Sequence, residues 1–360
     1  MEKEFDVNNL LLTGFHFPHH SENSGYEQIR HFIPADYVDA ANFPFFDAPF
    51  GTNPKRMNML LFDLFLKYKI KKFDVVHHLY PENHLIYSIT KKTKAKIIGT
   101  IHLPVADFLD KPSETPKDVF LKKRRRKLFN LLDGIIVLSS EEVAPTKTMF
   151  PNAEVVFIPH GVADFKAYFK EIKPVNKQND MQDNMKDHTQ NKIEICTIGT
   201  NYRDIALYEN IVNQARETHS NWHFHLIGVH KEWKDKFKNY PNITIHPYLS
   251  EKQYLQVLAK CHINFLPLLK ATANNVLLEA HSVGTISVAS NLPSVQDYSL
   301  LTTLLYDNAN QAFTLLEDIA NWDIKKLNLL KKQTLEQAIK FHWAKISKEF
   351  LDLYMKISKK

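Results

Sequence analysis

The chain has 360 residues, a formal net charge of +6, 44% hydrophobic residues and 12% aromatic residues. This length favours two domains of ordinary size, each able to bury a hydrophobic core. The mild positive charge suits anionic ligands or a membrane surface, and it does not by itself indicate nucleic-acid binding. The N-terminal sequence lacks a signal-peptide pattern, and no apolar run approaches the ~20 residues of a transmembrane helix. We therefore expect a cytoplasmic protein in which Cys196 and Cys261 are reduced, buried thiols.

The first half of the chain alternates short apolar runs with helical patterns. Amphipathic spacing predicts a helix at 57–70 and a basic helix at 117–132. The apolar runs between them predict parallel strands. These strands are expected at 8–14, 74–79, 95–101, 134–138 and 154–158.

The second half repeats this alternation after a polar segment, 171–192, which is typical of an exposed linker. We therefore place one domain at 1–170 and the other at 193–338, with a terminal helix in 339–360. Strands are predicted near 193–198, 222–228, 242–246, 262–266 and 285–289. Helices are predicted at 204–218, 231–238, 250–260 and 275–283.

Four of the nine glycines stand at or near the ends of predicted strands, at Gly14, Gly99, Gly199 and Gly228. Glycine permits the backbone to turn sharply and to approach a ligand closely. Parallel strands with ligands at their carboxyl ends are typical of doubly wound sheets. The sequence therefore predicts an α/β fold with two doubly wound, Rossmann-like domains.

The most informative segment runs from 270 to 294, where a small-residue loop enters a helix. The N–H groups of such a helix start are suited to a phosphate. Thr272, Asn274 and Asn275 open the helix, and helix capping is an alternative, compatible role for them. Glu279 stands in the apolar run Asn-Val-Leu-Leu-Glu-Ala, where an unpaired carboxylate would cost free energy. We interpret Glu279 as functional.

This segment resembles the donor helix of retaining GT-B glycosyltransferases of group 1, which use nucleotide sugars. Their E-x7-E motif places its second glutamate on Glu279 and its first on Ala271. The carboxylate expected against the transferred sugar is thus replaced, whereas that for the nucleotide ribose is retained. The resemblance extends to Asp74-Val-Val-His77, to Gly99-Thr-Ile-His102 and to a terminal helix that crosses back onto the first domain. It implies two domains that face a central cleft, with the acceptor bound by the first.

For the donor side, the resemblance implies that Gly199 and Arg203 lie near the diphosphate, because a basic residue is common there in the family. A guanidinium suits paired phosphate oxygens. Lys270 is the candidate for a second cation. A solvated surface side chain is the alternative for Arg203 and Lys270.

For the acceptor side, the resemblance places His102 near the donor sugar or the leaving phosphate, as a catalytic residue beside Glu279. An incidental histidine is the alternative, since the chain has 18. The loop after the first strand corresponds to a glycine-containing family loop, of which Gly25 remains for the donor phosphates. His16, Ser24 and Tyr26 in that loop are interpreted as acceptor or cleft residues.

The resulting hypothesis is a retaining, metal-independent glycosyltransferase with an unknown saccharide, glycolipid or other acceptor, in a pathway such as polysaccharide biosynthesis. Neither a Cys or His metal-ligand spacing nor an Asp-x-Asp motif is present, and no cofactor other than the nucleotide-sugar substrate is expected. The basic run 122–127 could contact an anionic membrane or acceptor, although a solvated helix face is the alternative. A catalytically weakened binding or scaffold subunit, and a nucleotide-sugar epimerase or hydrolase, remain alternatives. A dinucleotide oxidoreductase is disfavoured because no Gly-x-Gly-x-x-Gly motif follows a strand.

Overall fold

The computed structural model describes residues 9–15, 23–40, 54–84, 88–89, 91–109, 115–173 and 192–359. The chain divides into two compact units, Met1–Gly161 with Trp343–Lys360 and Val162–His342. The C-terminal helix therefore belongs to the same unit as the N-terminal residues. The sequence analysis drew its boundaries at 170, 193 and 339, and most of its polar linker, 174–191, lies outside the described residues.

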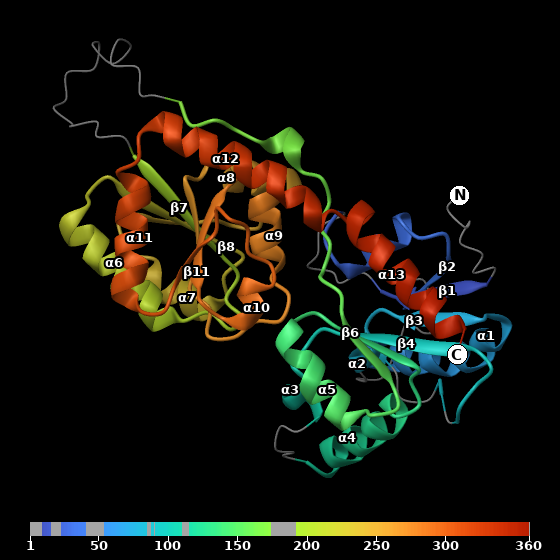
Figure 1. Cartoon of the computed structure of the whole chain (residues 1–360). Coiled ribbons are helices and arrows are strands. Elements are labelled where there is room, and N and C mark those ends of the chain that lie inside the picture. Colours follow the sequence, from blue (N-terminus) through green and yellow to red (C-terminus); the bar gives the residue numbers. More distant parts are fainter. Residues whose placement is uncertain are drawn as a thin grey trace, which may run out of the picture. The chain divides into compact units, whose positions relative to one another are not determined.

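The first unit contains a six-stranded parallel sheet of order β2-β1-β3-β4-β5-β6 (Figure 1). Its strands are β1 (Leu10–Gly14), β2 (Asp36–Asp39), β3 (Val75–His78), β4 (Lys96–Ile101), β5 (Gly134–Val137) and β6 (Glu154–Phe157). Its α-helices are α1 (Pro54–Lys69), α2 (Pro81–His84), α3 (Val105–Leu109), α4 (Pro116–Phe129), α5 (Val143–Met149) and α13 (Trp343–Ser358). Short 3₁₀ turns occupy Tyr26–His31, Ile70–Lys72 and Ser140–Glu142.

The second unit contains another six-stranded parallel sheet, of order β12-β11-β10-β7-β8-β9. Its strands are β7 (Ile193–Ile198), β8 (Trp222–Ile227), β9 (Ile243–Ile245), β10 (Ile263–Leu266), β11 (Ile286–Ser290) and β12 (Leu304–Tyr306). Its α-helices are α6 (Ile205–Thr218), α7 (Lys231–Phe237), α8 (Glu251–Lys260), α9 (Asn275–Ser282), α10 (Pro293–Gln296), α11 (Ala309–Ala320) and α12 (Ile324–Ala338). Two 3₁₀ turns occupy Lys166–Tyr168 and Ile339–Phe341.

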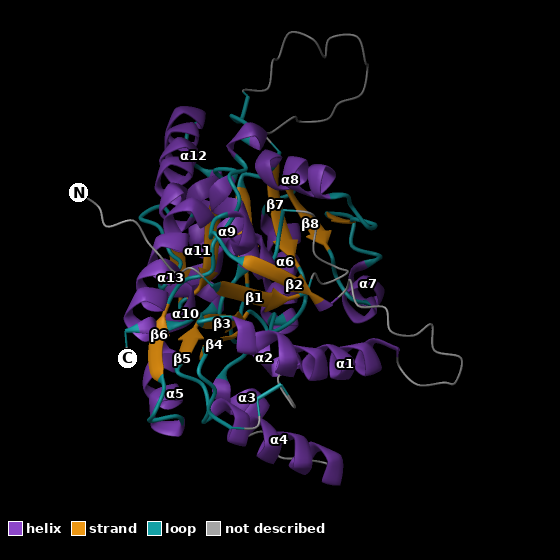
Figure 2. Ribbon diagram, turned by 90° about the vertical axis from the view of Figure 1, so that its right-hand side faces the viewer, coloured by secondary structure: helices purple, strands orange, loops and turns teal. Residues whose placement is uncertain are grey.

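Helices flank the strands of both sheets, which gives each unit the layers of a doubly wound fold (Figure 2). In the second unit, α6, α7 and α11 cover one face, and α8, α9 and α12 lie on the other side (Figure 1). Strand β8 shows how the sequence directs this packing. Trp222, Phe224 and Leu226 point into the core, whereas His223 and His225 alternate with them and stay half-buried.

The helices of the second unit begin at side chains that accept hydrogen bonds from the first helical turn. Asp204, Asn274, Asn308 and Asp323 each accept from the N–H three residues later, in α6, α9, α11 and α12. Helix α8 begins with a capping box of Ser250 and Gln253. These capping side chains fix where the helices begin. Two of the capped helices, α6 and α9, follow the loops in which the sequence analysis placed the donor site.

All ten predicted strands and the predicted helices are present, with boundaries that differ by a few residues. The sequence analysis missed β2 and β12, as well as α2, α3, α5, α10, α11 and α12. Both missed strands form an outer edge of a sheet and are short, with four and three residues. An edge strand has one neighbour, so its sequence carries less of the continuous apolar pattern that marks a central strand.

Candidate active site

The strand order of the second unit directs attention to the carboxyl ends of β7 and β10. From β7 the chain proceeds through β8 to β9 in one direction, and then returns to β10 on the other side of β7. Such a reversal leaves a crevice outside the carboxyl ends, where open α/β sheets bind ligands. The loops 199–204 and 267–274 leave these two strands. Backbone bonds join them, from Asp204 N–H to Pro267 O at 2.7 Å and from Leu269 N–H to Tyr202 O at 2.9 Å.

Arg203 lies in the first of these loops, and among the residues that the structure describes its side chain forms no hydrogen bond with a carboxylate. Its guanidinium donates to the carbonyls of Ile198 and Asn201, each at 3.0 Å. Within the described residues, its buried Nε has no hydrogen-bond partner. Burial lowers the pKa of Arg203 to about 10, while the nearby phenols of Tyr254 and Tyr306 favour its charge. Arg203 is thus cationic at neutral pH and has a buried donor to offer to an anion.

Gly199, at the tip of β7, has a φ of +72°, a conformation that L side chains rarely adopt. A Cβ at this position would lie 3.9 Å from the guanidinium of Arg203. The turn therefore favours glycine and places the backbone beside Arg203. That both residues lie near a donor diphosphate stays a prediction.

The second loop delivers the start of α9 to the same crevice. Asn274 is the N-cap residue, and its side chain accepts from Leu277 N–H at 3.1 Å. The cap uses one N–H of the first turn, so other N–H groups at this helix start remain available for a ligand. Asn275 is the first helical residue, and Lys270, Ala271 and Thr272 are half-buried in the preceding loop.

Glu279 lies one turn further along α9 and is 8% exposed. Its carboxylate accepts a hydrogen bond of 2.5 Å from the hydroxyl of Tyr254 on α8. Burial raises the pKa of Glu279 to about 7, although the bond from Tyr254 acts in the opposite direction. The sequence analysis identified Glu279 but missed Tyr254, which the spacing of α8 alone does not connect with α9.

The first unit has an analogous reversal between β1 and β3, and His102 follows the tip of β4, two strands along. The Nε2 of His102 lies 2.7 Å from Leu79 O, so Nε2 carries the proton because a carbonyl can only accept. Its backbone N–H donates to Glu82 at 2.9 Å. The ring stacks on Tyr80 and meets Tyr26 edge-on, with ring centroids 4.5 Å and 4.8 Å apart. His102 is therefore held in one orientation and one tautomer.

The remaining first-unit candidates follow β1 in the chain, and those that the structure describes differ in their burial. Tyr26 is 1% exposed and its hydroxyl lies 3.1 Å from Thr100 Oγ1, so it packs against His102. The acceptor role suggested for Tyr26 stays a prediction. Gly25 precedes it with a φ of +105°, and Ser24 is half-buried. His16 lies outside the described residues.

Residues that the sequence analysis did not identify support His102. Glu82 is 6% exposed, and burial raises its pKa to about 7. Hydrogen bonds from backbone N–H groups, including that of His102, act in the opposite direction because they stabilise the ionised carboxylate. The Tyr80 hydroxyl donates to Glu27 at 2.7 Å and accepts from Tyr26 N–H. These residues are far apart in the sequence, so the hydrogen bonds emerge only when β3, β4 and the Tyr26–His31 turn come together.

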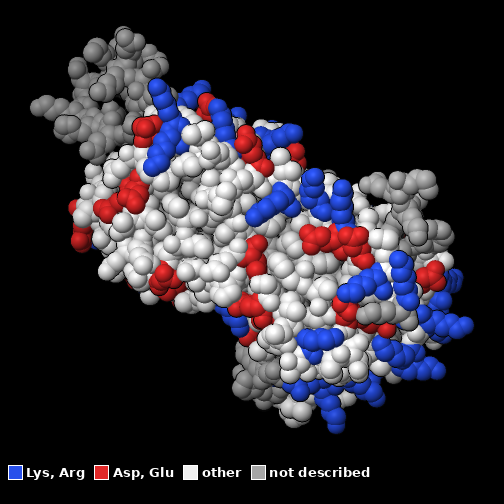
Figure 3. Space-filling view, viewed as in Figure 1, with Lys and Arg blue, Asp and Glu red and all other residues white. Residues whose placement is uncertain are grey.

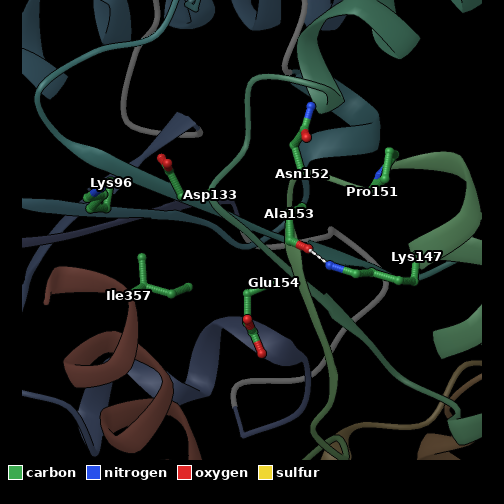
Figure 4. Close-up of a pocket in the computed structure, with 8 residues that line it drawn as sticks. All are labelled: Lys96, Asp133, Lys147, Pro151, Asn152, Ala153, Glu154 and Ile357. Atoms are coloured by element: carbon green, nitrogen blue, oxygen red, sulfur yellow. Dashed lines mark hydrogen bonds between the residues drawn. The ribbon is translucent and has the colours of Figure 1, made fainter. Parts of the chain in front are cut away.

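A hollow of about 300 Å³ in the first unit lies at the opposite end of the strands (Figure 4). It is lined by the starts of β4 and β6, and its Lys147 donates to Ala153 O at 2.5 Å. Asp133 and Glu154 are paired with Lys92 and Lys356, at 3.0 and 2.7 Å. Its position at the amino ends of the strands and its paired charges distinguish this hollow from the ligand crevices of such sheets.

Comparison with known sequences agrees with this geometry. The model of Glycosyltransferase Family 4 matches residues 18–164, and that of Glycosyl transferases group 1 matches residues 195–318. The chain is a glycosyltransferase of the GT-B fold. No curated protein sequence matches it.

Solved structures share this fold over nearly the whole chain. A sucrose-phosphate synthase from Thermosynechococcus elongatus is 15% identical, with 97% of this chain and 98% of that chain covered and a TM-score of 0.69. Anabaena HepE, in complex with UDP and glucose, is 10% identical over 96% and 99% of the two chains, with a TM-score of 0.63. An Escherichia coli trehalose-6-phosphate protein bound to UDP-2-fluoro glucose is 9% identical over 98% and 99%, with a TM-score of 0.64.

The enzyme is therefore a transferase of sugars built on two Rossmann-like units, as the sequence predicted. None of its described helices is both long and apolar enough to cross a membrane.

Proposed function

We propose that the second unit binds a nucleotide-diphosphate sugar at the carboxyl ends of β7 and β10. Arg203 carries this proposal, because a half-buried cation whose buried Nε–H is unused, near a helix start, is suited to a diphosphate. Glu279 stands one turn into the same helix and would accept hydrogen bonds from the ribose hydroxyls. The UDP complex of HepE supports the donor class by analogy of fold.

The proposed chemistry is transfer with retention of the anomeric configuration and without a metal. Breaking the glycosidic bond of the donor leaves negative charge on the diphosphate and positive charge on the sugar. Arg203 and the N–H groups at the start of α9 would stabilise the diphosphate, with Lys270 as a further cation. Product analysis by NMR would identify the anomeric configuration, and an inverted product would overturn the retaining assignment.

His102 is the first unit's candidate for contact with the transferred sugar. Its fixed Nε2–H leaves Nδ1 as the nitrogen that bears the lone pair in the neutral ring. Tyr26, Tyr80 and Glu82 would position this ring without touching substrate. Ser24 and Gly25 remain the acceptor-side and phosphate-side candidates of the same unit, and the acceptor is a saccharide, a glycolipid or another hydroxyl compound.

We further propose that α4 brings the enzyme to the anionic, cytoplasmic face of a membrane. Lysine and arginine side chains gather over this helix (Figure 3), and Val119 and Phe120 on it are each 54% exposed. Basic residues beside exposed apolar ones suit an anionic lipid surface. Replacing Arg124 and Arg126 by Gln should reduce sedimentation with phosphatidylserine vesicles, whereas the matched α13 changes Lys345→Gln and Lys348→Gln should not. Equal sedimentation of both variants would contradict this contact.

The donor proposal is tested by thermal-shift and turnover measurements with UDP-, GDP-, ADP- and dTDP-sugars. A bound donor stabilises the folded protein by RT ln(1 + L/Kd), where L is the free donor concentration. The correct nucleotide class should therefore raise the melting temperature. Glu279→Ala should lose this shift, because it removes the proposed ribose contact. Glu336→Gln, on the exposed face of α12, is a control carboxylate outside the proposed contacts.

The outcomes separate the possible functions. Donor binding with transfer to an added acceptor supports a glycosyltransferase with this donor site. Binding without turnover indicates a scaffold subunit, and sugar release without an acceptor indicates a hydrolase or epimerase. If no nucleotide shifts the wild-type protein, the proposed donor site is wrong.

A further inference from the structure

A second cluster of chemically active side chains lies on the sheet of the second unit, away from the crevice. Glu194 on β7 is directly opposite His223 on β8, and His225 follows two residues later on the same face. Their immediate neighbours Ile195, Trp222 and Phe224 point into the core from the other face. The alternation of β-strand side chains thus gathers one carboxylate and two imidazoles on a half-buried surface.

The three groups are close enough to share one ion. One oxygen of Glu194 and one nitrogen each of His223 and His225 all lie within 4.8 Å of one another. In particular, His225 Nε2 lies 2.7 Å from Glu194 Oε2. Ligand atoms bound at about 2.0–2.2 Å to one Zn²⁺ are separated by less than twice that length, so small side-chain rotations would complete the geometry.

The neighbouring strand β9 contributes groups that orient the two imidazoles. His225 Nδ1 lies 2.8 Å from His246 Nε2, and His223 Nε2 lies 2.7 Å from Thr244 Oγ1. Metal-binding histidines commonly use their second nitrogen in such a bond, which fixes the tautomer and the ring orientation. With Nδ1–H of His225 donated to His246, its Nε2 becomes the nitrogen that faces Glu194 and can accept a metal.

We propose that Glu194, His223 and His225 bind one divalent transition-metal ion, for which Zn²⁺ is the expected choice. Imidazole with carboxylate is a ligand set that suits Zn²⁺ and disfavours Mg²⁺ or Ca²⁺, which prefer oxygen ligands. The ion would join β7 to β8 near their amino ends, whereas the donor crevice lies at their carboxyl ends. It therefore stabilises the second unit and takes no part in sugar transfer.

Lys192 is a cation of the protein itself that would compete with a metal ion for Glu194. Its Nζ lies 3.0 Å from Glu194 Oε1, and its side chain is 56% exposed. A cation beside the ligand carboxylate opposes binding of a second cation, and a side chain this exposed can turn into solvent. Replacing Lys192 by Gln should therefore tighten metal binding, an effect that a mere hydrogen-bonded cluster would not show.

The experiment uses the full chain without an affinity tag, stripped with a chelator and titrated with ZnCl₂ in competition with a chromophoric chelator. Wild type should bind one Zn²⁺ per chain, and Glu194→Gln and His225→Asn should each weaken binding by at least about tenfold. His219→Asn is the matched control, since His219 pairs with the single carboxylate of Glu317 at 3.4 Å and should leave binding unchanged.

A second readout guards against variants that fold poorly. Zn²⁺ at about a hundredfold excess over its dissociation constant should raise the melting temperature of wild type by about 5–10 °C, and each ligand variant should lose that shift whatever its starting value. Co²⁺ in place of Zn²⁺ should give visible d–d absorption bands of a four-coordinate site. Equal zinc affinity in wild type and both ligand variants, or equal loss in His219→Asn, would show adventitious binding and overturn the proposal.

Discussion

The two units have the same kind of sheet but use the region of its strand-order reversal in opposite ways. In the first unit, described residues around the β3 and β4 tips are packed with rings, as Tyr26, Tyr80 and His102 contact one another. In the second unit, the β7 and β10 tips carry turns, a helix start and the cation Arg203. Both sheets thus have the same topology at this point, but the side chains form an aromatic cluster in the first unit and present a cation and a helix start in the second.

Both regions also contain one buried carboxyl group whose pKa is raised to about 7, Glu82 in the first unit and Glu279 in the second. Glu82 accepts from the backbone of His102, whereas Glu279 accepts from the side chain of Tyr254. The same shift therefore accompanies a positioning role in one unit and a proposed ligand-binding role in the other. Mutations that separate these roles test the comparison.

The largest expected effect is on transfer when Arg203 is replaced. Arg203→Ala should lower kcat/KM for the nucleotide sugar by about 100- to 1,000-fold, as expected when a preorganised donor to developing charge is removed. Arg203→Lys should recover only part of this loss, because an ammonium lacks the paired geometry of a guanidinium. Steady-state kinetics measure both effects, and an unchanged kcat/KM in Arg203→Ala would remove this residue from the proposed site.

A steric comparison of two glycines should give the next largest effect. A Cβ on Gly161 would lie 2.3 Å from the Trp343 ring, so Gly161→Ala should destabilise the first unit by about 1–3 kcal/mol. Gly228 has a φ of +64° and no atom within 4 Å of the position that a Cβ would take, and asparagine tolerates this conformation. Thermal unfolding should therefore show little change for Gly228→Asn. A larger loss of stability in Gly228→Asn than in Gly161→Ala would contradict the contrast.

The pH dependence of donor binding should distinguish the two carboxyl groups. Ribose hydroxyls donate to an ionised Glu279, and its raised pKa of about 7 means that ionisation is lost as the pH falls below this value. The affinity for a nucleotide sugar should therefore decrease by about tenfold from pH 8 to pH 6. Calorimetric titration should show this slope in wild type and in Glu82→Gln. It should disappear in Glu279→Gln, and a slope that persists there would assign the titration to another group.

The same two carboxyl groups make the stability of the folded protein depend on pH, in a direction that follows from their pKa values. Their folded pKa values lie above their ordinary value of 4.5, so the folded state retains protons that the unfolded state has lost. Stability should consequently fall as the pH rises from about 4.5 to about 7. Glu279→Gln should flatten part of that decrease, which thermal unfolding at several pH values would measure.

The smallest effect is expected from Tyr26→Phe. This change removes the hydroxyl that lies 3.1 Å from Thr100 Oγ1 but keeps the ring against His102. The loss should be about 1 kcal/mol in stability, typical of one hydrogen bond, with KM for the acceptor unchanged. A large increase in acceptor KM would support the acceptor role that the sequence analysis suggested for Tyr26.

The fold could be predicted from the sequence because its central strands carry continuous apolar runs and many of its helices carry amphipathic spacing. It also offered Arg203 and Glu279 as candidates, since a basic residue soon after Gly199 and a carboxylate in an apolar run are visible without coordinates. Tyr254, Tyr80 and Glu82 escaped, because their roles depend on contacts between elements that are distant in sequence. The burial of Tyr26 could not be predicted either, because it depends on contacts with α13, which is distant in the sequence.

The two connections between the units have a consequence for engineering and for evolution. Val162 pairs with His342, and its N–H donates to Phe341 O at 2.9 Å, so the second unit begins and ends at one point. In the first unit, Gly161 and Trp343 are likewise in contact. A segment whose two ends lie together can be replaced as a unit without distorting the rest of the protein. The residues 162–342 could thus be replaced by those of another member of the fold while the first unit is left intact.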